Sequence, residues 1–209
     1  MSIIVFESVD GMGKSAVIEQ LIKKYPDKFD SMAFPSEIFK QEINDEGVIT
    51  PVDFNNNTLS TLIHYHTAFE IDFMVHIDEI QKKSKKAGHL LLDRYFISNI
   101  AYAEINFIKH GYQGHPFLQL LERIDHGIIP DLVICLKAYT LDNFPEKEDS
   151  HFTKQELSHV QYCYTNLLPQ LRVQDKIKDY ANVVLLSESY RNENLFEMVE
   201  AVVKEKGFL

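Results

Sequence analysis

The segment VFESVDGMGKSAV, residues 5–17, limits the fold of this chain more than any other stretch. Apolar residues run up to Glu7, a turn with two glycines follows, and a helical pattern starts at Lys14. A strand that enters a helix through a glycine-bearing turn ending in Gly-Lys-Ser is typical of a phosphate-binding loop. The pattern GxxxxGK[ST] has glycine where this chain has Ser8, so one turn glycine is missing. The segment predicts an α/β domain that binds a phosphate-bearing ligand after its first strand.

The loop keeps the residue types that contact charge. Its backbone N–H groups would surround phosphates, the Lys14 ammonium would reach the outer phosphates, and the Ser15 hydroxyl would bind Mg²⁺. The alternative is a structural strand–turn–helix connection without a ligand, and the strand and helix on either side favour the phosphate loop. We therefore predict ATP and Mg²⁺ as cofactors. The residues expected to bind ATP are Asp10, Gly11, Met12, Gly13, Lys14, Ser15 and Ala16.

Short apolar runs alternate with longer segments of helical period along the chain, which predicts an α/β fold in one domain over 1–209. The runs lack polar alternation, as is typical of parallel strands buried on both faces. The expected strands are 3–7, 31–34, 89–92, 132–136 and 183–186. The expected helices are 14–25, 58–86, 96–109, 116–126, 153–179 and 192–206. The polar segment 138–152, which contains Pro145, suits a mobile lid.

The composition excludes several classes of protein. A formal net charge of −10 disfavours binding to a nucleic-acid polymer. No apolar run is long enough to cross a membrane, and the N-terminus reads as a strand rather than a signal sequence. Cys135 and Cys163 lie far apart without a CxxC pair, and His64, His66 and His76 match no zinc pattern. We expect a cytoplasmic protein whose partner is a small-molecule nucleotide, with these histidines on the surface or lining a pocket.

A second motif, DRYFISNIAY at 93–102, follows the apolar run 89–92. The carboxyl end of a parallel strand lies on the ligand-binding edge of such a sheet. Asp93 can bind Mg²⁺ or orient an attacking oxygen, and Arg94 offers a planar fork to a phosphate. The alternative is that the two side chains pair with each other or cap the next helix. The phosphate loop elsewhere in the chain favours the functional interpretation.

These motifs resemble those of the thymidylate kinases, a family of nucleoside monophosphate kinases. IVFESVDGMGKS is similar to the family's FEGxDGxGKS loop, DRYFISNIAY to its DRYxxSxxAY stretch, and PDLVICL to the strand before its lid. FPSE at 34–37 is a weaker match to FPxR. The resemblance implies a three-layer α/β/α P-loop kinase fold with a five-stranded parallel sheet. It also implies a homodimer that phosphorylates a deoxynucleoside monophosphate with ATP, most often dTMP to dTDP.

The resemblance assigns roles to particular side chains. Asp10 would accept a hydrogen bond from the sugar 3′-hydroxyl, Arg94 would hold the acceptor phosphate, and Phe69 would either stack on the base or belong to the core. The expected catalytic residues are Lys14, Asp93 and Arg94, and the expected Mg²⁺ ligands are Ser15 and Asp93. The expected substrate-binding residues are Asp10, Phe34, Pro35, Phe69, Phe73, Arg94, Ser98 and Tyr102.

The chain departs from the family in the position of its arginines. The family places an arginine in the phosphate loop or in the lid, and this chain has none in either segment. Lys147 and Lys154 are the lid candidates that would replace it, although lysine lacks the fork geometry of arginine. The alternative is that each is an ordinary surface lysine. The four arginines of the chain are Arg94, Arg123, Arg172 and Arg191.

Two further family arginines are absent from the acceptor side. Glu37 occupies the arginine position of FPxR, and the family's base-reading arginine is replaced near Phe73, in the expected helix 58–86. These departures leave the base preference open and keep two alternatives to a monophosphate kinase. One is a deoxynucleoside kinase that uses Glu37 as a general base toward a 5′-hydroxyl. The other is a nucleotide-binding regulatory module without phosphoryl transfer.

Overall fold

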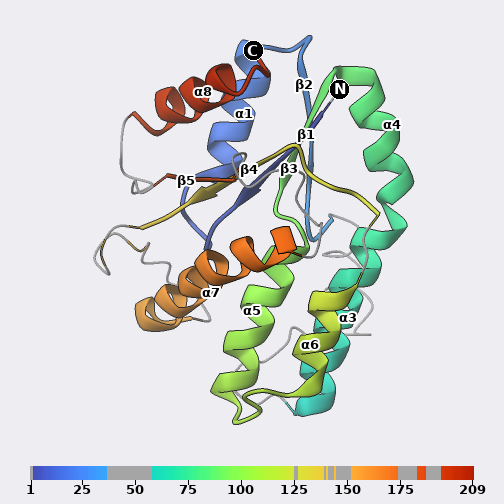
Figure 1. The fold of residues 1–209 in the computed structure, drawn as a ribbon, viewed down its shortest axis with the longest axis vertical. Helices are drawn as coiled ribbons and strands as arrows, with labels where there is room; N and C mark the ends of the chain where they lie inside the picture. The colour runs from blue at the N-terminus through green and yellow to red at the C-terminus, as the bar shows by residue number, and fades with distance from the viewer. Residues whose placement is uncertain are drawn as a thin grey trace.

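The computed structural model describes residues 2–36, 58–124, 127–138, 140, 144, 152–173, 183–186 and 194–209. In this part of the chain a five-stranded sheet has the order β2-β3-β1-β4-β5 (Figure 1). All neighbouring strands are parallel, which confirms the prediction. The strands are β1 (Ser2–Glu7), β2 (Phe29–Ala33), β3 (His89–Asp93), β4 (Leu132–Leu136) and β5 (Val183–Leu186).

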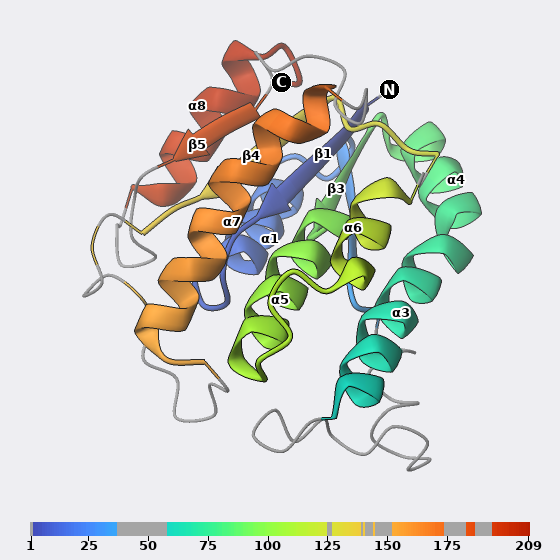
Figure 2. The same cartoon turned by 60° about the horizontal axis from the view of Figure 1, so that its bottom comes forward.

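Helices cover both faces of the sheet, as a three-layer α/β/α fold requires (Figures 1 and 2). Helices α1 and α8 pack together on one face, and α5 and α7 lie side by side on the other. Helix α3 packs along α5, and α4 continues from α3 beside β2 and β3. The helices are α1 (Lys14–Lys24), α3 (Leu59–Val75), α4 (Ile77–Ala87), α5 (Phe96–Lys109), α6 (Pro116–Arg123), α7 (Lys154–Val173) and α8 (Leu195–Glu205).

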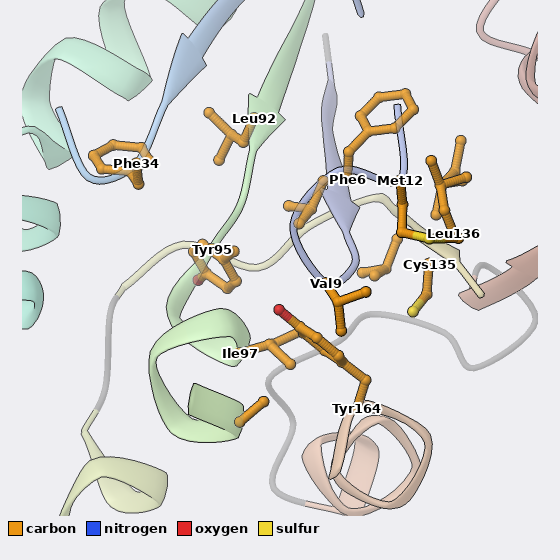
Figure 3. Packing of buried hydrophobic residues seen from close by; sticks show 14 of the residues in the cluster. Phe6, Val9, Met12, Phe34, Leu92, Tyr95, Ile97, Cys135, Leu136 and Tyr164 are labelled. Carbon is orange, nitrogen blue, oxygen red and sulfur yellow. The ribbon is translucent and has the colours of Figure 1, made fainter. Parts of the chain in front are cut away.

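The centre of the sheet forms the hydrophobic core and fixes the loop that follows β1. Strand β4 is buried over its whole length, as expected for a strand covered on both faces. Val9 and Met12 of the loop are also buried. Figure 3 shows Val9 directed toward Tyr164 of α7 and Met12 directed toward Leu136 of β4. These two apolar side chains anchor the loop, so its intervening residues stay at the surface of the sheet edge.

The predicted helix 58–86 is wrong as one continuous element, because it breaks at His76. The backbone N–H of His76 donates to the carbonyl oxygen of Phe73 at 3.2 Å instead of continuing the α-helical ladder. The imidazole Nδ1 donates to the carbonyl oxygen of Asp72 at 2.7 Å, which satisfies the acceptor that the break leaves free. Asp78 and Glu79 then lie in the first turn of α4, where a helix favours acidic side chains.

Several strand and helix boundaries differ from the predicted ones by a few residues. Strand β2 begins at Phe29 rather than at 31, because the buried Phe29 side chain packs against His89 of β3. Helix α6 ends at Arg123, earlier than predicted, and the described part of α7 extends to Val173. Most of the predicted lid, 138–152, lies outside the described residues. None of the described helices combines the length and the apolar character that crossing a bilayer requires.

Candidate active site

A cavity of about 660 Å³ opens at the carboxyl ends of β1, β2 and β3. This is the edge at which parallel α/β sheets bind ligands, and the phosphate loop and the DRY motif both lie there. The residues that line the cavity are Asp10, Gly11, Gly13, Lys14, Ser15, Ala16, Ile18, Glu19, Ser31, Met32, Ala33, Phe34, Pro35, Asp93 and Arg94.

The loop has the backbone conformation of an anion-binding turn. Gly11 and Gly13 have φ values of 81° and 87°, a region that side chains disfavour, so glycine is required at both positions. Helix α1 begins immediately afterwards at Lys14, and the N–H groups of its first turn face the cavity end of the sheet. The predicted strand–loop–helix arrangement is therefore present in the structure.

Ser8 gives Lys14 one contact that the expected glycine could not make, through its hydroxyl. The Lys14 Nζ donates to the Ser8 hydroxyl oxygen at 3.0 Å and to its carbonyl oxygen at 3.3 Å. Lys14 is 5% exposed, so its ammonium lies at the base of the loop. The Tyr164 hydroxyl donates to the same Ser8 carbonyl at 3.3 Å, which ties the loop to α7.

Ser15 and Asp93 meet across the cavity, as predicted for a pair that shares a metal ion. The Ser15 hydroxyl donates to Asp93 Oδ2 at 2.5 Å. A hydroxyl and a carboxylate are both hard oxygen donors, and Mg²⁺ prefers such ligands together with water and phosphate oxygens. The residues present therefore fit a Mg²⁺ ion held between the loop and the end of β3.

Arg94 points toward the loop rather than pairing with Asp93. Its guanidinium forms an ion pair with Asp10 and lies over the Tyr102 ring, with Cζ 5.4 Å from the ring centroid. The backbone φ of Arg94 is 74°, in the left-handed region that favours glycine. The Arg94 backbone N–H donates to the Phe6 carbonyl oxygen at 2.9 Å. A positive φ in an arginine is an uncommon backbone strain that tends to occur at functional sites.

Glu7 lies beneath Arg94 and the loop. The sequence did not indicate it as a site residue. It is fully buried at the end of β1, and it accepts hydrogen bonds from the Tyr95 N–H at 3.0 Å and the Ser98 hydroxyl at 2.5 Å. Burial raises the pKa of Glu7 to about 8, although the Ser98 hydrogen bond and the charges of Lys14 and Arg94 oppose the shift. The signal in the sequence is a carboxylate at the last position of an otherwise apolar strand.

A second, smaller cavity of about 130 Å³ adjoins the first, since Asp10 and Arg94 line both. Its walls come from α3, from α5 and from Phe152, whose ring centroid lies 5.5 Å from that of Tyr102. A polar series at helical spacing on α5 could have indicated this wall. The lining residues are Asp10, Tyr65, His66, Phe69, Arg94, Ser98, Asn99, Tyr102, Asn106 and Phe152.

The structure brings most of the predicted site residues to these two cavities, but not all. Met12 is part of the core and lines neither cavity. Phe73 also lies in the core, with its ring centroid 4.9 Å from that of Phe34 and 4.8 Å from that of Tyr95. Lys154 is half-buried at the start of α7, and Lys147 lies outside the described residues.

Comparison with known proteins connects this geometry to a family. No protein-family model matches the chain. A probable thymidylate kinase of Methanocaldococcus jannaschii is 31% identical over 153 residues, which cover 70% of this chain and 73% of that protein. A probable thymidylate kinase of Sulfurisphaera tokodaii is 31% identical over 100 residues, and this match spans 48% of each protein.

Solved structures give the same fold. The thymidylate kinase of Candida albicans aligns with a TM-score of 0.69 at 17% identity, over 99% of this chain and 92% of that one. The thymidylate kinase of Ehrlichia chaffeensis aligns with a TM-score of 0.59 at 18% identity, over 98% and 97%. The phosphate loop, the DRY motif and the extent of the match to the Methanocaldococcus jannaschii protein agree. The chain therefore belongs to the thymidylate kinase family.

Proposed function

We propose that this chain transfers the γ-phosphoryl group of ATP to the phosphate of dTMP, giving dTDP and ADP. The observation that carries the proposal is the junction of the two cavities at Asp10 and Arg94. The larger cavity has the loop for a triphosphate, and the smaller one has the aromatic walls for a base. The acceptor phosphate would lie where they meet.

In the larger cavity, the loop residues would hold the ATP phosphates. The backbone N–H groups and Lys14 would neutralise charge on the transferring phosphoryl group. Mg²⁺ held by Ser15 and Asp93 would supply further charge neutralisation at the phosphate oxygens. Before ligand binding, Lys14 contacts Ser8, and it would exchange these contacts for phosphate oxygens.

At the junction, Arg94 would bind the acceptor phosphate, and Asp10 would accept a hydrogen bond from the sugar. The ion pair between them holds the guanidinium in place before the acceptor arrives, which lowers the cost of ordering it. The acceptor phosphate is itself an anionic nucleophile, so the reaction needs no strong general base. Phe69 and Tyr102 would contact the base and sugar from the walls of the smaller cavity.

The lid, the oligomeric state and the location belong to the same proposal. Lys147 and Lys154 would close over the phosphates in place of a lid arginine. A homodimer would form through α3, where Ile71, Met74 and Val75 are 55%, 48% and 67% exposed. The protein would work in the cytoplasm, where thiols such as the free cysteines Cys135 and Cys163 stay reduced.

The test is an ADP-release assay with purified protein, Mg·ATP and a panel of acceptors. We expect turnover with dTMP that depends on both ATP and Mg²⁺, and little with thymidine. Turnover with thymidine but not with dTMP would identify a deoxynucleoside kinase instead. Tight ATP binding without ADP release for any acceptor would identify a regulatory module, and either result would overturn the proposal.

A further inference from the structure

Three side chains with metal-binding atoms meet where α5 packs against α7, the two helices that lie side by side in Figure 2. Glu104 comes from α5, and His159 and Cys163 come from α7. A carboxylate oxygen, an imidazole nitrogen and the thiol sulfur lie within 4.8 Å of one another. None of the three residues lines either cavity of the candidate active site. We call these three residues the α5–α7 cluster.

The cluster combines a helical spacing with a tertiary contact. His159 and Cys163 are four residues apart, and residues at that spacing lie one turn apart on the same side of a helix. Their ligand atoms meet that of Glu104, so this side of α7 faces α5. Because the third side chain comes from another helix, no spacing along the chain indicates the cluster.

One imidazole nitrogen of the cluster lacks a hydrogen bond. His159 Nε2 is closed to solvent, and it has no hydrogen-bond partner among the residues that the structure describes. Its distance to Glu104 Oε1 is 3.9 Å, which is too long for a hydrogen bond. A buried polar atom without a partner is unfavourable, and a bound ion is one physical reason for it. A cation between the three ligand atoms would satisfy this nitrogen.

The separations within the cluster suit a small tetrahedral ion after a modest movement. Zn²⁺ binds nitrogen and oxygen at about 2.0–2.2 Å and sulfur at about 2.3 Å, so its ligands lie roughly 3.3–3.8 Å apart. The His159 and Glu104 ligand atoms, at 3.9 Å, are already close to this range. These two side chains are 38% and 40% exposed, so they can rotate to close the remaining gaps. The same exposure gives an ion a path from solvent.

The Cys163 thiol holds a proton that a metal ion would replace. Cys163 is 2% exposed, and its thiol donates a hydrogen bond to the Glu104 carboxylate. Burial, and then this hydrogen bond and the carboxylate charge, raise the pKa of the thiol. An ion that binds must displace the thiol proton to solvent, and the metal–thiolate bond compensates for that cost. A thiolate, a carboxylate and a neutral imidazole together balance a charge of two.

We propose that the α5–α7 cluster binds a thiophilic divalent cation, with Zn²⁺ held by Glu104, His159, Cys163 and one water molecule. Thiolate and imidazole ligands favour Zn²⁺, whereas Mg²⁺ and Ca²⁺ prefer oxygen ligands. The site is distinct from the pair of oxygen donors that fits Mg²⁺ in the larger cavity, and it lies outside the reaction.

The ion would tie α7 to α5 close to the contact that supports the phosphate loop. Tyr164 adjoins Cys163 in α7, and its hydroxyl donates to the carbonyl oxygen of Ser8 at 3.3 Å. A bond across the two helices restricts the movement of α7, and an ion that binds only the folded state stabilises it. The role of the site is therefore structural.

The test uses Co²⁺ as a spectroscopic probe of reduced, metal-free protein. Co²⁺ binds the same kinds of ligand as Zn²⁺, and a cobalt–thiolate bond adds an intense charge-transfer band in the near ultraviolet. Co²⁺ bound only by the oxygen donors of the larger cavity lacks this band. We expect one equivalent of Co²⁺ to produce the band and Zn²⁺ to remove it by displacement. Absence of the band in the folded wild-type protein overturns the proposal.

Variants identify the residues that hold the ion. Cys163→Ser should abolish the band. Loss of a group that merely supports a ligand lowers metal affinity by about 10–100-fold, so loss of Cys163 should weaken Zn²⁺ binding by about 100-fold or more. Glu104→Gln should keep the band and weaken Zn²⁺ binding by about 10-fold or more. The matched control is Cys135→Ala, because Cys135 is also free and buried but lies outside the cluster, and it should keep the full band.

Thermal unfolding gives a second readout that needs no colour. With free Zn²⁺ at about 100 times Kd, the Tm of the wild-type protein should rise by about 5 °C or more. Cys163→Ser should lose this rise, whereas His64→Ala, at an exposed histidine of α3, should keep it. Should Cys163→Ser not fold, the wild-type titration and Glu104→Gln still decide.

The outcomes that contradict the site are equally specific. A band or a rise in Tm that persists in Cys163→Ser would place the ion elsewhere and overturn the proposal. Loss of the band in Cys135→Ala would do the same. The measurements use no nucleotide, so their result is independent of the proposed function.

Discussion

The two cavities that meet at Arg94 are built in opposite ways. The larger cavity takes its phosphate-binding groups from consecutive residues of one loop and from the residues that end β3, so its chemistry lies in short motifs. The smaller cavity takes single side chains from α3, from α5 and from Phe152, far apart in the chain. In the proposed function, backbone N–H groups would bind the ligand in the first cavity, and side chains held by their neighbours would bind it in the second. The difference teaches that the lining of the larger cavity is set mainly by neighbours in sequence, whereas the lining of the smaller cavity is set by tertiary packing.

The largest expected effect is in the phosphate cavity. Lys14→Ala should lower kcat/KM with dTMP by about 1,000-fold, because it removes a cation aimed at the transferring phosphoryl group. Steady-state ADP release measures the loss, and circular dichroism checks that the variant is folded. Lys23→Ala, an exposed lysine in the last turn of α1, is the matched control and should retain wild-type activity. Near-normal turnover in a folded Lys14→Ala variant would contradict the assignment of the loop.

Arg94 lies at the boundary, and its substitution tests whether the two cavities divide the substrates. Arg94→Ala should lower kcat/KM for dTMP by about 100-fold while changing the KM for ATP by less than about 3-fold. Arg94→Lys should recover little, because lysine lacks the planar fork. Arg123→Ala changes an exposed arginine of α6 and should have no effect. A matching rise in both KM values would show that Arg94 does not distinguish donor from acceptor.

Glu7 lies under both cavities, and its titration should change the stability of the fold rather than the rate of the reaction. The folded pKa of about 8 lies above the reference value of 4.5, so between these values the native state binds more protons than the unfolded state. Stability should therefore fall as pH rises from 4.5 to about 8, by on the order of 5 kcal/mol, or about 10 °C in Tm. Glu7→Gln should lack this decline. Urea unfolding between pH 5 and 9 measures it, and Glu205→Gln, at an exposed position of α8, should behave as wild type.

A decline with pH that persists unchanged in Glu7→Gln would assign the titration to another group. The residues packed around Glu7 would then owe their stability to groups other than the Glu7 carboxylate. A decline that disappears in Glu7→Gln, with Arg94 function intact, would instead separate the structural role of the cluster from substrate binding.

The fold was predictable because its main signals are local. The apolar run of β4 has no polar alternation, which requires cover on both faces, and its predicted boundaries are those of the structure. The break at His76 was not predictable in the same way. The pattern on both sides remains helical, and the break depends on one imidazole reaching the Asp72 carbonyl.

The candidate site also combines residues that local motifs predict with residues whose position depends on tertiary packing. Lys14, Ser15, Asp93 and Arg94 were predicted from motifs, and the structure brings all four to one cavity. Phe73 was predicted to bind substrate and lies in the core instead, because residues of an apolar helix face are alike in sequence whether they meet a ligand or another side chain.

By itself, the sequence determined that a parallel sheet carries a phosphate loop at its carboxyl edge, since glycines, Lys14 and Ser15 act through backbone conformations and charges that their immediate neighbours set. Only the tertiary structure decided that Asp10 and Arg94 join two cavities and that Glu7 is buried beneath them. It also decided that the Asn106 amide oxygen is buried with no hydrogen-bond partner among the described residues. The physical reason is that burial, pKa and amide orientation depend on which side chains from other elements surround a group. No spacing along the chain contains that information.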